Sequence, residues 1–191
     1  MFRAAIYKGE ITPIDPYNPL GLPPNTIRVK FKSGYTPNMG DTRTIVDSTN
    51  NVWDIYKASN DWYNFFYYNL DLLEVLGANT TNVTNMYNTF VNCYSLTTVP
   101  LFDTSNVTSM YRMFYDCRSL TSVPLFNTSK VTNMTLMLAQ CYMVESGALA
   151  LYQQASTQTN PPSEHIQAFY SCGSNTVTGA AELAQIPSGW K

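Results

Sequence analysis

The most regular feature of the chain is a recurrence of hydrophobic positions every 24 residues, separated by polar stretches rich in Asn and Thr. Four columns keep this spacing: Val83, Val107 and Val131; Met86, Met110 and Met134; Phe90, Phe114 and Leu138; and Cys93, Cys117 and Cys141. An internal repeat of this length is typical of proteins built from stacked units that share one core. A weaker copy upstream, with Trp62 and Phe66 in the Met and Phe columns, extends the region to residues 59–145, or about four coils.

The two halves of each unit show different periodicities. Residues 107–117 carry hydrophobic side chains with the spacing of one helical face, and residues 120–125 follow the L-x-x-L-x-L spacing of leucine-rich repeats. The sequence therefore predicts an α/β fold: a leucine-rich-repeat-like solenoid of about four 24-residue coils, with a small N-terminal β cap and a helical C-terminal cap. Because Pro100 and Pro124 have no backbone N–H, we expect strands of only about three or four residues.

The flanking sequences predict three further segments. Residues 1–25 contain five prolines between positions 11 and 25 and are expected to form an extended arm. Residues 26–58 alternate with the strand period and contain a hairpin signal at Asn50–Asn51, which predicts the β cap. After the repeats of 59–145, residues 146–191 include two helix-favouring stretches, at 148–155 and 179–185, and are expected to form the C-terminal cap.

The run from Phe102 to Val123, with Asn106-Val107-Thr108 and Met113-Phe114-Tyr115-Asp116-Cys117, resembles the BspA-like bacterial surface leucine-rich repeat, which also occurs in mycoplasma lipoproteins. The similarity is specific over residues 79–145. It implies a surface-exposed adhesion or recognition module, and similar repeats occur in virion proteins of phages that infect gut bacteria. The resemblance implies no catalytic residues, and a fold analogy by itself says little about the ligand.

Charge and hydropathy exclude two classes of partner. Only 13% of the residues are charged, and 11 Lys and Arg against 13 Asp and Glu give a net charge of −2. Nucleic acid is therefore not an expected partner, because it requires clustered positive charge. No run of 18 apolar residues is present and the N-terminus lacks the apolar core of a signal peptide, so we expect neither membrane insertion nor export through a signal peptide.

Few residues suit catalysis or metal binding. His165 is the only histidine, no C-x-x-C motif occurs, and the glycine-rich phosphate-binding motifs are missing. The cysteine column is expected to be buried and reduced, since three parallel thiols cannot all pair. The carboxylates Asp103, Asp116 and Glu145 lie near the repeats, but solvated loop positions explain them better than a glycosidase pair. We therefore predict that the chain is not an enzyme and has no cofactor and no metal site.

Aromatic residues outside the core columns indicate a candidate binding face. Tyr87 and Tyr111 flank the inward helical face, Arg112 lies opposite it, and Phe102 and Phe126 are expected to alternate outward from the neighbouring leucines. A column of exposed aromatic side chains is typical of an interaction surface. The alternative is that the phenyl rings cover the next loop.

The function favoured by these observations is a non-enzymatic phage virion structural protein, a head or tail appendage or fibre that presents the repeats for host-surface recognition. Its expected partners are other virion proteins, which it would contact through residues 1–25, and a host-surface glycan or protein. A second copy of the chain is a further option as partner. It would be assembled in the bacterial cytoplasm and located on the virion. The alternatives are an adhesin module on the bacterial cell surface and a carbohydrate-active enzyme.

Overall fold

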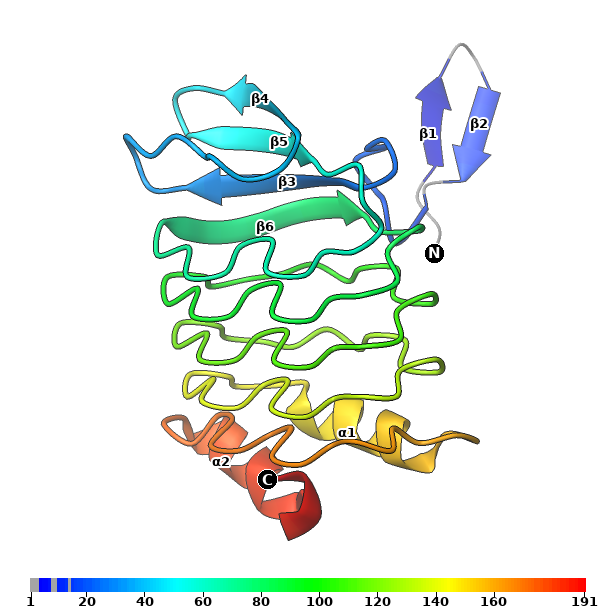
Figure 1. The fold of residues 1–191 in the computed structure, drawn as a ribbon, viewed down its shortest axis with the longest axis vertical. Coiled ribbons are helices and arrows are strands. Elements are labelled where there is room, and N and C mark those ends of the chain that lie inside the picture. Colours follow the sequence, from blue (N-terminus) through cyan, green and yellow to red (C-terminus); the bar gives the residue numbers. More distant parts are fainter. Residues whose placement is uncertain (1–3, 8–9, 14) are drawn as a thin grey trace.

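The computed structural model describes residues 4–7, 10–13 and 15–191 of this chain (Figure 1). The strands are β1 (Ala4–Tyr7), β2 (Glu10–Pro13), β3 (Thr26–Phe31), β4 (Thr42–Asp47), β5 (Val52–Tyr56) and β6 (Leu72–Asn79). The helices are α1 (Ala148–Thr157), α2 (Val177–Gln185) and the short 3-10 helix η1 (Ser188–Trp190). Strands β3 to β6 form one antiparallel sheet in the order β4-β5-β3-β6, whereas β1 pairs with β2 in a separate hairpin.

The four-stranded sheet follows from alternation along its strands. The alternate residues of β3 from Ile27 to Phe31 are buried in the core, and between them Arg28 points away and pairs with Asp54 of β5 at 2.7 Å. Strands β4 and β5 form the hairpin predicted around Asn50–Asn51. Asn51 has the left-handed φ of 53° that this tight turn requires and that asparagine tolerates better than most residues.

Between the sheet and the helices, the chain forms stacked units that keep a 24-residue step (Figure 1). Parallel bridges join Asp61 to Asn85, Asn85 to Ser109, and Ser109 to Asn133. Backbone hydrogen bonds in the same register reinforce each bridge, such as the one from Met86 N to Ser109 O at 3.0 Å. Backbone N–H groups of each unit therefore donate hydrogen bonds to carbonyl groups of the next unit. Buried backbone groups need such partners.

The predicted α/β leucine-rich-repeat-like solenoid with a helical cap is wrong. The regular secondary structure of the main body is a small four-stranded antiparallel sheet with two α-helices. Within residues 80–145, all of which the structure describes, there is neither a helix nor an extended strand. The segment 107–117, predicted as a helix, consists of consecutive turns.

The turns replace the helix because two positions in each segment have left-handed backbone. Arg112 and Asp116 have φ values of 51° and 59°, which a right-handed helix cannot contain. The N–H groups of the segment also bond to the next unit, as in Phe114 N to Met137 O at 2.9 Å, rather than within a helix. Successive turns direct every third or fourth side chain inward, which is the same spacing that predicts a helix.

The strand halves are also shorter than predicted. Parallel pairing in this part of the chain consists of single bridges, from Glu74 of β6 to Thr98 and from Ser122 to Ser146. Pro100 and Pro124 follow two residues after the bridged positions 98 and 122, and neither has an N–H to donate. Pairing therefore ends after one bridge instead of continuing for three or four residues.

The two helices predicted after the repeats are present as α1 and α2. The Glu182 carboxylate on α2 accepts a hydrogen bond from Leu149 N at 3.0 Å, in the first turn of α1, where N–H groups lack a partner within the helix. Gly147 precedes α1 with a φ of 97°, and an added Cβ there would lie 2.0 Å from the carbonyl oxygen of Val123. These contacts fix both helices against the last unit.

The predicted proline-rich arm, residues 1–25, only partly coincides with the described structure, since residues 1–3, 8, 9 and 14 lie outside it. From residue 15 onward the segment packs on the sheet. Leu22 is buried and its carbonyl accepts a hydrogen bond from Asn79 Nδ2 at 2.7 Å, while Asn25 N donates to Asn79 O at 2.9 Å. Residues 15–25 are thus attached to β6 rather than extended away from the fold.

The core of the stack consists of side chains in register from unit to unit. The rings of Phe66, Phe90 and Phe114 stack with centroid separations of 5.4 and 5.3 Å and nearly parallel planes. The burial predicted for the repeat columns is confirmed for Val83, Met86, Phe90, Val107, Met110, Phe114, Val131, Met134 and Leu138. One continuous apolar core therefore runs from the sheet to the C-terminal helices.

The predicted burial of the cysteine column is also confirmed, and its thiols have a structural role. Cys93, Cys117 and Cys141 are free and buried, and each Sγ donates a hydrogen bond to a phenylalanine carbonyl of the preceding unit at 3.0–3.1 Å. Burial raises the pKa of all three thiols, that of Cys141 to about 12. The three cysteines are therefore protonated thiols in the folded stack.

Phe114→Ala should lower the free energy of unfolding by about 3–5 kcal/mol, because it removes a ring stacked on both sides and leaves a cavity. Urea unfolding followed by circular dichroism measures this change. Leu125→Ala is the control, since Leu125 is 51% exposed and its loss should have little effect. Equal stability of the two variants would contradict the stacked core.

Stability should decrease at high pH because of the buried thiols. Their raised pKa keeps them protonated in the folded state, whereas thiols in the unfolded chain ionise above a pH of about 8.5. Each buried thiol then lowers the free energy of unfolding by up to about 1.4 kcal/mol per pH unit as the pH rises toward the folded pKa. Urea unfolding between about pH 8 and 10 should show a steeper decline for the natural protein than for Cys117→Ala, and parallel curves would contradict this assignment.

Candidate binding face

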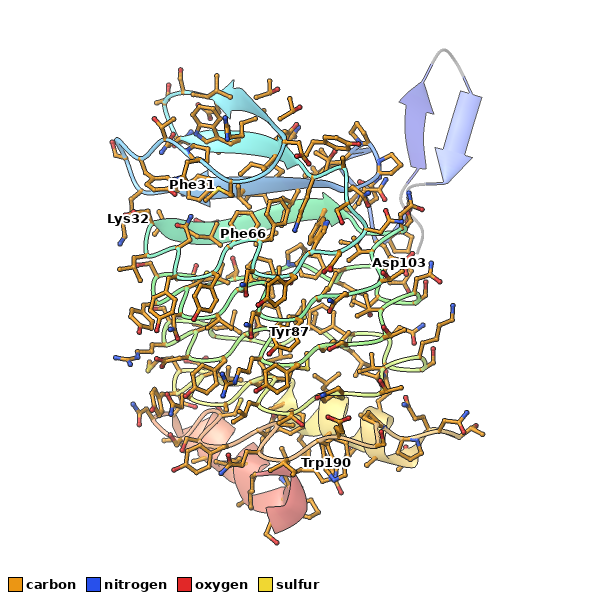
Figure 2. All side chains as sticks on the ribbon, in the orientation of Figure 1. Phe31, Lys32, Phe66, Tyr87, Asp103 and Trp190 are labelled. Carbon is orange, nitrogen blue, oxygen red and sulfur yellow. The ribbon has the colours of Figure 1, made fainter. Side chains whose placement is uncertain are left out.

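Three tyrosines at the 24-residue step form a ladder on the outer side of the turn segments. Tyr87 stacks on Tyr111 with ring centroids 4.5 Å apart and planes 16° from parallel, and its other neighbour, Tyr63, lies at 5.2 Å. Figure 2 shows Tyr87 near the middle of this face. The stacking of the units thus aligns Tyr87 and Tyr111, both predicted site residues, in one row.

The tyrosines point outward because of the residues that precede them. Met86 is fully buried, whereas Tyr87 is only partly buried. The Asn85 side chain also accepts a hydrogen bond from Tyr87 N at 2.9 Å, and its amide donates to Asp61 in the preceding unit. These Asx turns fix the backbone at the start of each turn segment, so the tyrosine row is rigidly supported.

Arg112 lies beside this row and has no acidic partner. Its guanidinium carbon is 5.1 Å from the ring centre of Tyr111 and 5.2 Å from that of Tyr115. None of the ion pairs among the described residues includes Arg112, and its buried Nε has no hydrogen-bond partner. We call Tyr63, Tyr87, Tyr111, Arg112 and Tyr115 the aromatic strip.

Arg118 provides the contrast within the same unit. Its guanidinium binds both carboxylate oxygens of Asp116 at 2.8 and 2.9 Å and lies 4.5 Å from the ring centre of Tyr94. The hydrogen-bonded Asp116 raises the pKa of Arg118. Arg118 is therefore committed to an internal ion pair, whereas Arg112 retains donors for a ligand.

The predicted outward orientation of Phe102 and Phe126 is wrong. Both side chains are fully buried and stack on each other at 5.6 Å, while the adjacent Leu125 is half exposed. The strand alternation fails because the chain does not continue as a strand after Pro124. Instead, Phe126 N donates to the carbonyl of Pro124 at 2.9 Å, a tight turn that directs the ring inward.

The sequence analysis missed Tyr63 and Tyr115 as members of the strip. Tyr63 lies 24 residues before Tyr87, so the alignment that placed Trp62 in the Met column also contained this signal. Tyr115 has no equivalent signal, since the same column contains Val91 and Ala139 in the neighbouring units. Its position beside Arg112 depends on the turn geometry.

The position of Tyr87 in the row also affects its ionisation. Burial raises the pKa of Tyr87, and the adjacent Tyr111 adds to the increase because two neighbouring phenolates would repel each other. Tyr87 is therefore a neutral phenol near neutral pH, able to donate and accept hydrogen bonds.

The candidate acids do not form a facing pair with free oxygens. Asp116 is held in the ion pair with Arg118, and Asp103 Oδ1 accepts a hydrogen bond from Ser105 N in its own turn at 3.0 Å. Glu145 is exposed. Within the part of the chain that the structure describes, no group of three His, Cys, Asp or Glu side chains is placed to hold a metal ion.

Stacked 24-residue units that align a row of partly exposed aromatic side chains define a repeat-built domain with an aromatic face. The family model for "Mycoplasma protein of unknown function, DUF285" matches residues 41–160, and the chain belongs to this family. The family is associated with BspA-like surface repeat proteins, in partial agreement with the resemblance noted from the sequence. No curated protein and no solved structure matches the chain. Among the described residues, no helix is long and apolar enough to span a membrane.

The tyrosine stack should contribute measurable coupling energy. In a double-mutant cycle, Tyr87→Ala and Tyr111→Ala should show a coupling of about 0.5–1.5 kcal/mol in the free energy of unfolding, as expected for stacked aromatic pairs. A second cycle with Tyr87→Ala and Tyr56→Ala is the control, because Tyr56 on β5 forms no pair with Tyr87 among the described aromatic contacts. If the changes in the free energy of unfolding are additive in both cycles, the stacking of the tyrosine ladder is contradicted.

Proposed function

We propose that this chain is a non-enzymatic recognition module that binds an extended glycan through the aromatic strip. The observation that carries the proposal is the row of three tyrosines at a constant step, with an arginine beside it that has no acidic partner. The ring faces of Tyr87 are covered by Tyr63 and Tyr111, so a ligand reaches the ring edges and hydroxyl groups of this row. Sugar hydroxyl groups can form hydrogen bonds with the phenol hydroxyls and accept them from guanidinium donors.

The geometry of the strip favours an extended ligand over a compact one. The ring centres of Tyr63, Tyr87 and Tyr111 follow one another at 5.2 and 4.5 Å along the stack, so contacts are available over successive units. Tyr63 is half exposed, whereas Trp62 and Phe66 in the same unit are buried. Core packing does not require an aromatic residue at Tyr63, which supports a role in binding.

Two settings are consistent with this activity. The association of the family with surface repeat proteins supports display on a bacterial cell. The virion setting, with residues 1–25 attaching the chain to a phage particle, is supported by the hairpin of β1 and β2, which pairs with no other described strand. Isolated two-stranded hairpins are marginally stable in water, so this one would gain stability from a partner surface. A protein inventory of purified particles and surface labelling of intact cells distinguish the two settings.

A binding assay on the intact protein tests the proposal. Purified capsular and cell-wall polysaccharides from bacteria should bind the natural protein, and Tyr87→Ala or Tyr111→Ala should weaken binding at least tenfold in isothermal titration calorimetry. Arg112→Gln should also weaken binding, because it removes the unpaired cation. Tyr56→Ala is the matched control, since Tyr56 is 38% exposed on β5 and does not belong to the strip.

Unchanged binding in the strip variants, with folding verified by circular dichroism, would refute the role of this face. Turnover of the polysaccharide into shorter products would instead support the carbohydrate-active enzyme. If only protein components bind and no polysaccharide does, the ligand of the strip is a protein and not a glycan.

A further inference from the structure

A pocket of about 370 Å³ lies where the loop after β3 meets the first turn segment of the stack. Its walls come from residues within 35–39 and 64–69. Asn64 lines the pocket and directly follows Tyr63, so the pocket adjoins the first end of the aromatic strip. In Figure 2, Phe66, which also lines it, lies above Tyr87. The volume is close to the lower limit of ligand pockets, about 300 Å³, and suits a small ligand.

The walls of the pocket are held in place by hydrogen bonds. Asn69 Nδ2 donates to the Tyr35 hydroxyl at 3.0 Å, and Asn69 Oδ1 accepts from Leu72 N at 2.9 Å. The Tyr35 ring also packs 4.8 Å from the ring of Phe31 in β3. The loop and the turn segment are therefore joined before any ligand binds, and the pocket is preformed.

The first unit departs from the others at Tyr68, which lines this pocket. Tyr68 has a φ of 57°, and the equivalent left-handed positions in the next three units are occupied by Asn92, Asp116 and Gln140. An aromatic residue is unusual in this conformation, whereas Asn and Asp are enriched there. Tyr68 is also 53% exposed, so core packing does not compensate for the strain.

Tyr67 is a second exposed aromatic residue of the pocket. It is 46% exposed, whereas Val91, at the same position in the next unit, is 4% exposed, and Tyr115 of the aromatic strip has this position two units later. The rings of Tyr67 and Tyr68 lie 4.7 Å apart at an angle of 63°, so they present differently oriented faces at the pocket. An exposed aromatic residue at a left-handed position that the other units fill with a polar residue indicates a role outside folding.

The chemistry of the lining favours an uncharged ligand that carries hydroxyl groups. All lining residues are uncharged, and three of them are tyrosines with both a ring face and a hydroxyl. Asn64 Oδ1 is a buried acceptor without a hydrogen-bond partner, as is the equivalent Asn88 Oδ1 of the next unit, and Asn38 adds a second amide to the pocket. A sugar hydroxyl can donate to Asn64 Oδ1, whereas an aromatic peptide side chain such as phenylalanine would leave it unpaired.

We propose that this pocket is the end subsite of the binding face and holds one neutral hexose ring. The ring stacks on Tyr68, and one of its hydroxyl groups donates a hydrogen bond to Asn64 Oδ1. The proposal rests on the proposed function, because the aromatic strip then binds the sugar units that follow. The pocket selects the terminal residue of the glycan, and the strip provides the extended contact.

The test uses the methyl glycosides of glucose, galactose and mannose as probes of the full-length protein, with saturation-transfer NMR as the readout. At least one glycoside should bind, and Tyr68→Asn and Asn64→Gly should each weaken it at least tenfold. Both variants suit the left-handed backbone, so unfolding stability should be retained. Tyr170→Asn is the matched control, because Tyr170 is 45% exposed and does not line the pocket.

The outcomes separate this proposal from the proposed function. Tyr87→Ala should leave binding of the monosaccharide unchanged and weaken binding of the polysaccharide. If no glycoside binds while polysaccharide binding still depends on Tyr87, the assignment of the pocket as a subsite is refuted and that of the aromatic strip stands. Glycoside binding that is equal in Tyr68→Asn and the natural protein would also overturn it, as would binding of phenylalanine amide or of N-acetylneuraminic acid in place of the neutral hexoses.

Discussion

The structure depends on backbone hydrogen bonds between residues 23 or 24 positions apart. Bonds such as Met86 N to Ser109 O and Met110 N to Asn133 O connect each unit to the next, and in the turn segments they alternate with bonds inside the unit, such as Met113 N to Met110 O. A single unit therefore cannot satisfy its own backbone, and it becomes stable only with a neighbour on each side. At one end β6 provides that neighbour, and at the other residues 164–170 do, supported by α1 and α2.

This register has opposite consequences on the two sides of the chain. Inward positions form columns of identical or similar residues, so the phenylalanine rings stack and each cysteine thiol reaches a carbonyl of the unit before it. Outward positions are aligned just as strictly, although packing places no demand on them. The tyrosines of the aromatic strip occupy such outward positions, and their alignment follows from the same hydrogen bonds that align the core.

Two departures from the repeat, Arg112 and Tyr68, lie in the aromatic strip and the pocket. Arg112 occupies a left-handed position that is asparagine in the two preceding units, and it forms none of the ion pairs among the described residues. Tyr68 occupies another left-handed position and lines the pocket. A residue poorly suited to its backbone conformation is tolerated where the surrounding stack determines that conformation, which is common at ligand-binding sites.

The sequence by itself determined the 24-residue period, the buried columns, the hairpin of β4 and β5 and the helices α1 and α2, because burial and turn chemistry act locally and repeat. It also indicated Tyr87, Tyr111 and Arg112 as outward residues. It did not distinguish a helix from successive turns, since both place every third or fourth residue inward. Only the tertiary structure decided that choice, because N–H groups bonded to the neighbouring unit are unavailable for a helix. The same long-range bonding decided that Phe126 turns inward and that Tyr35 meets Asn69 at the pocket, contacts between residues whose spacing carries no local signal.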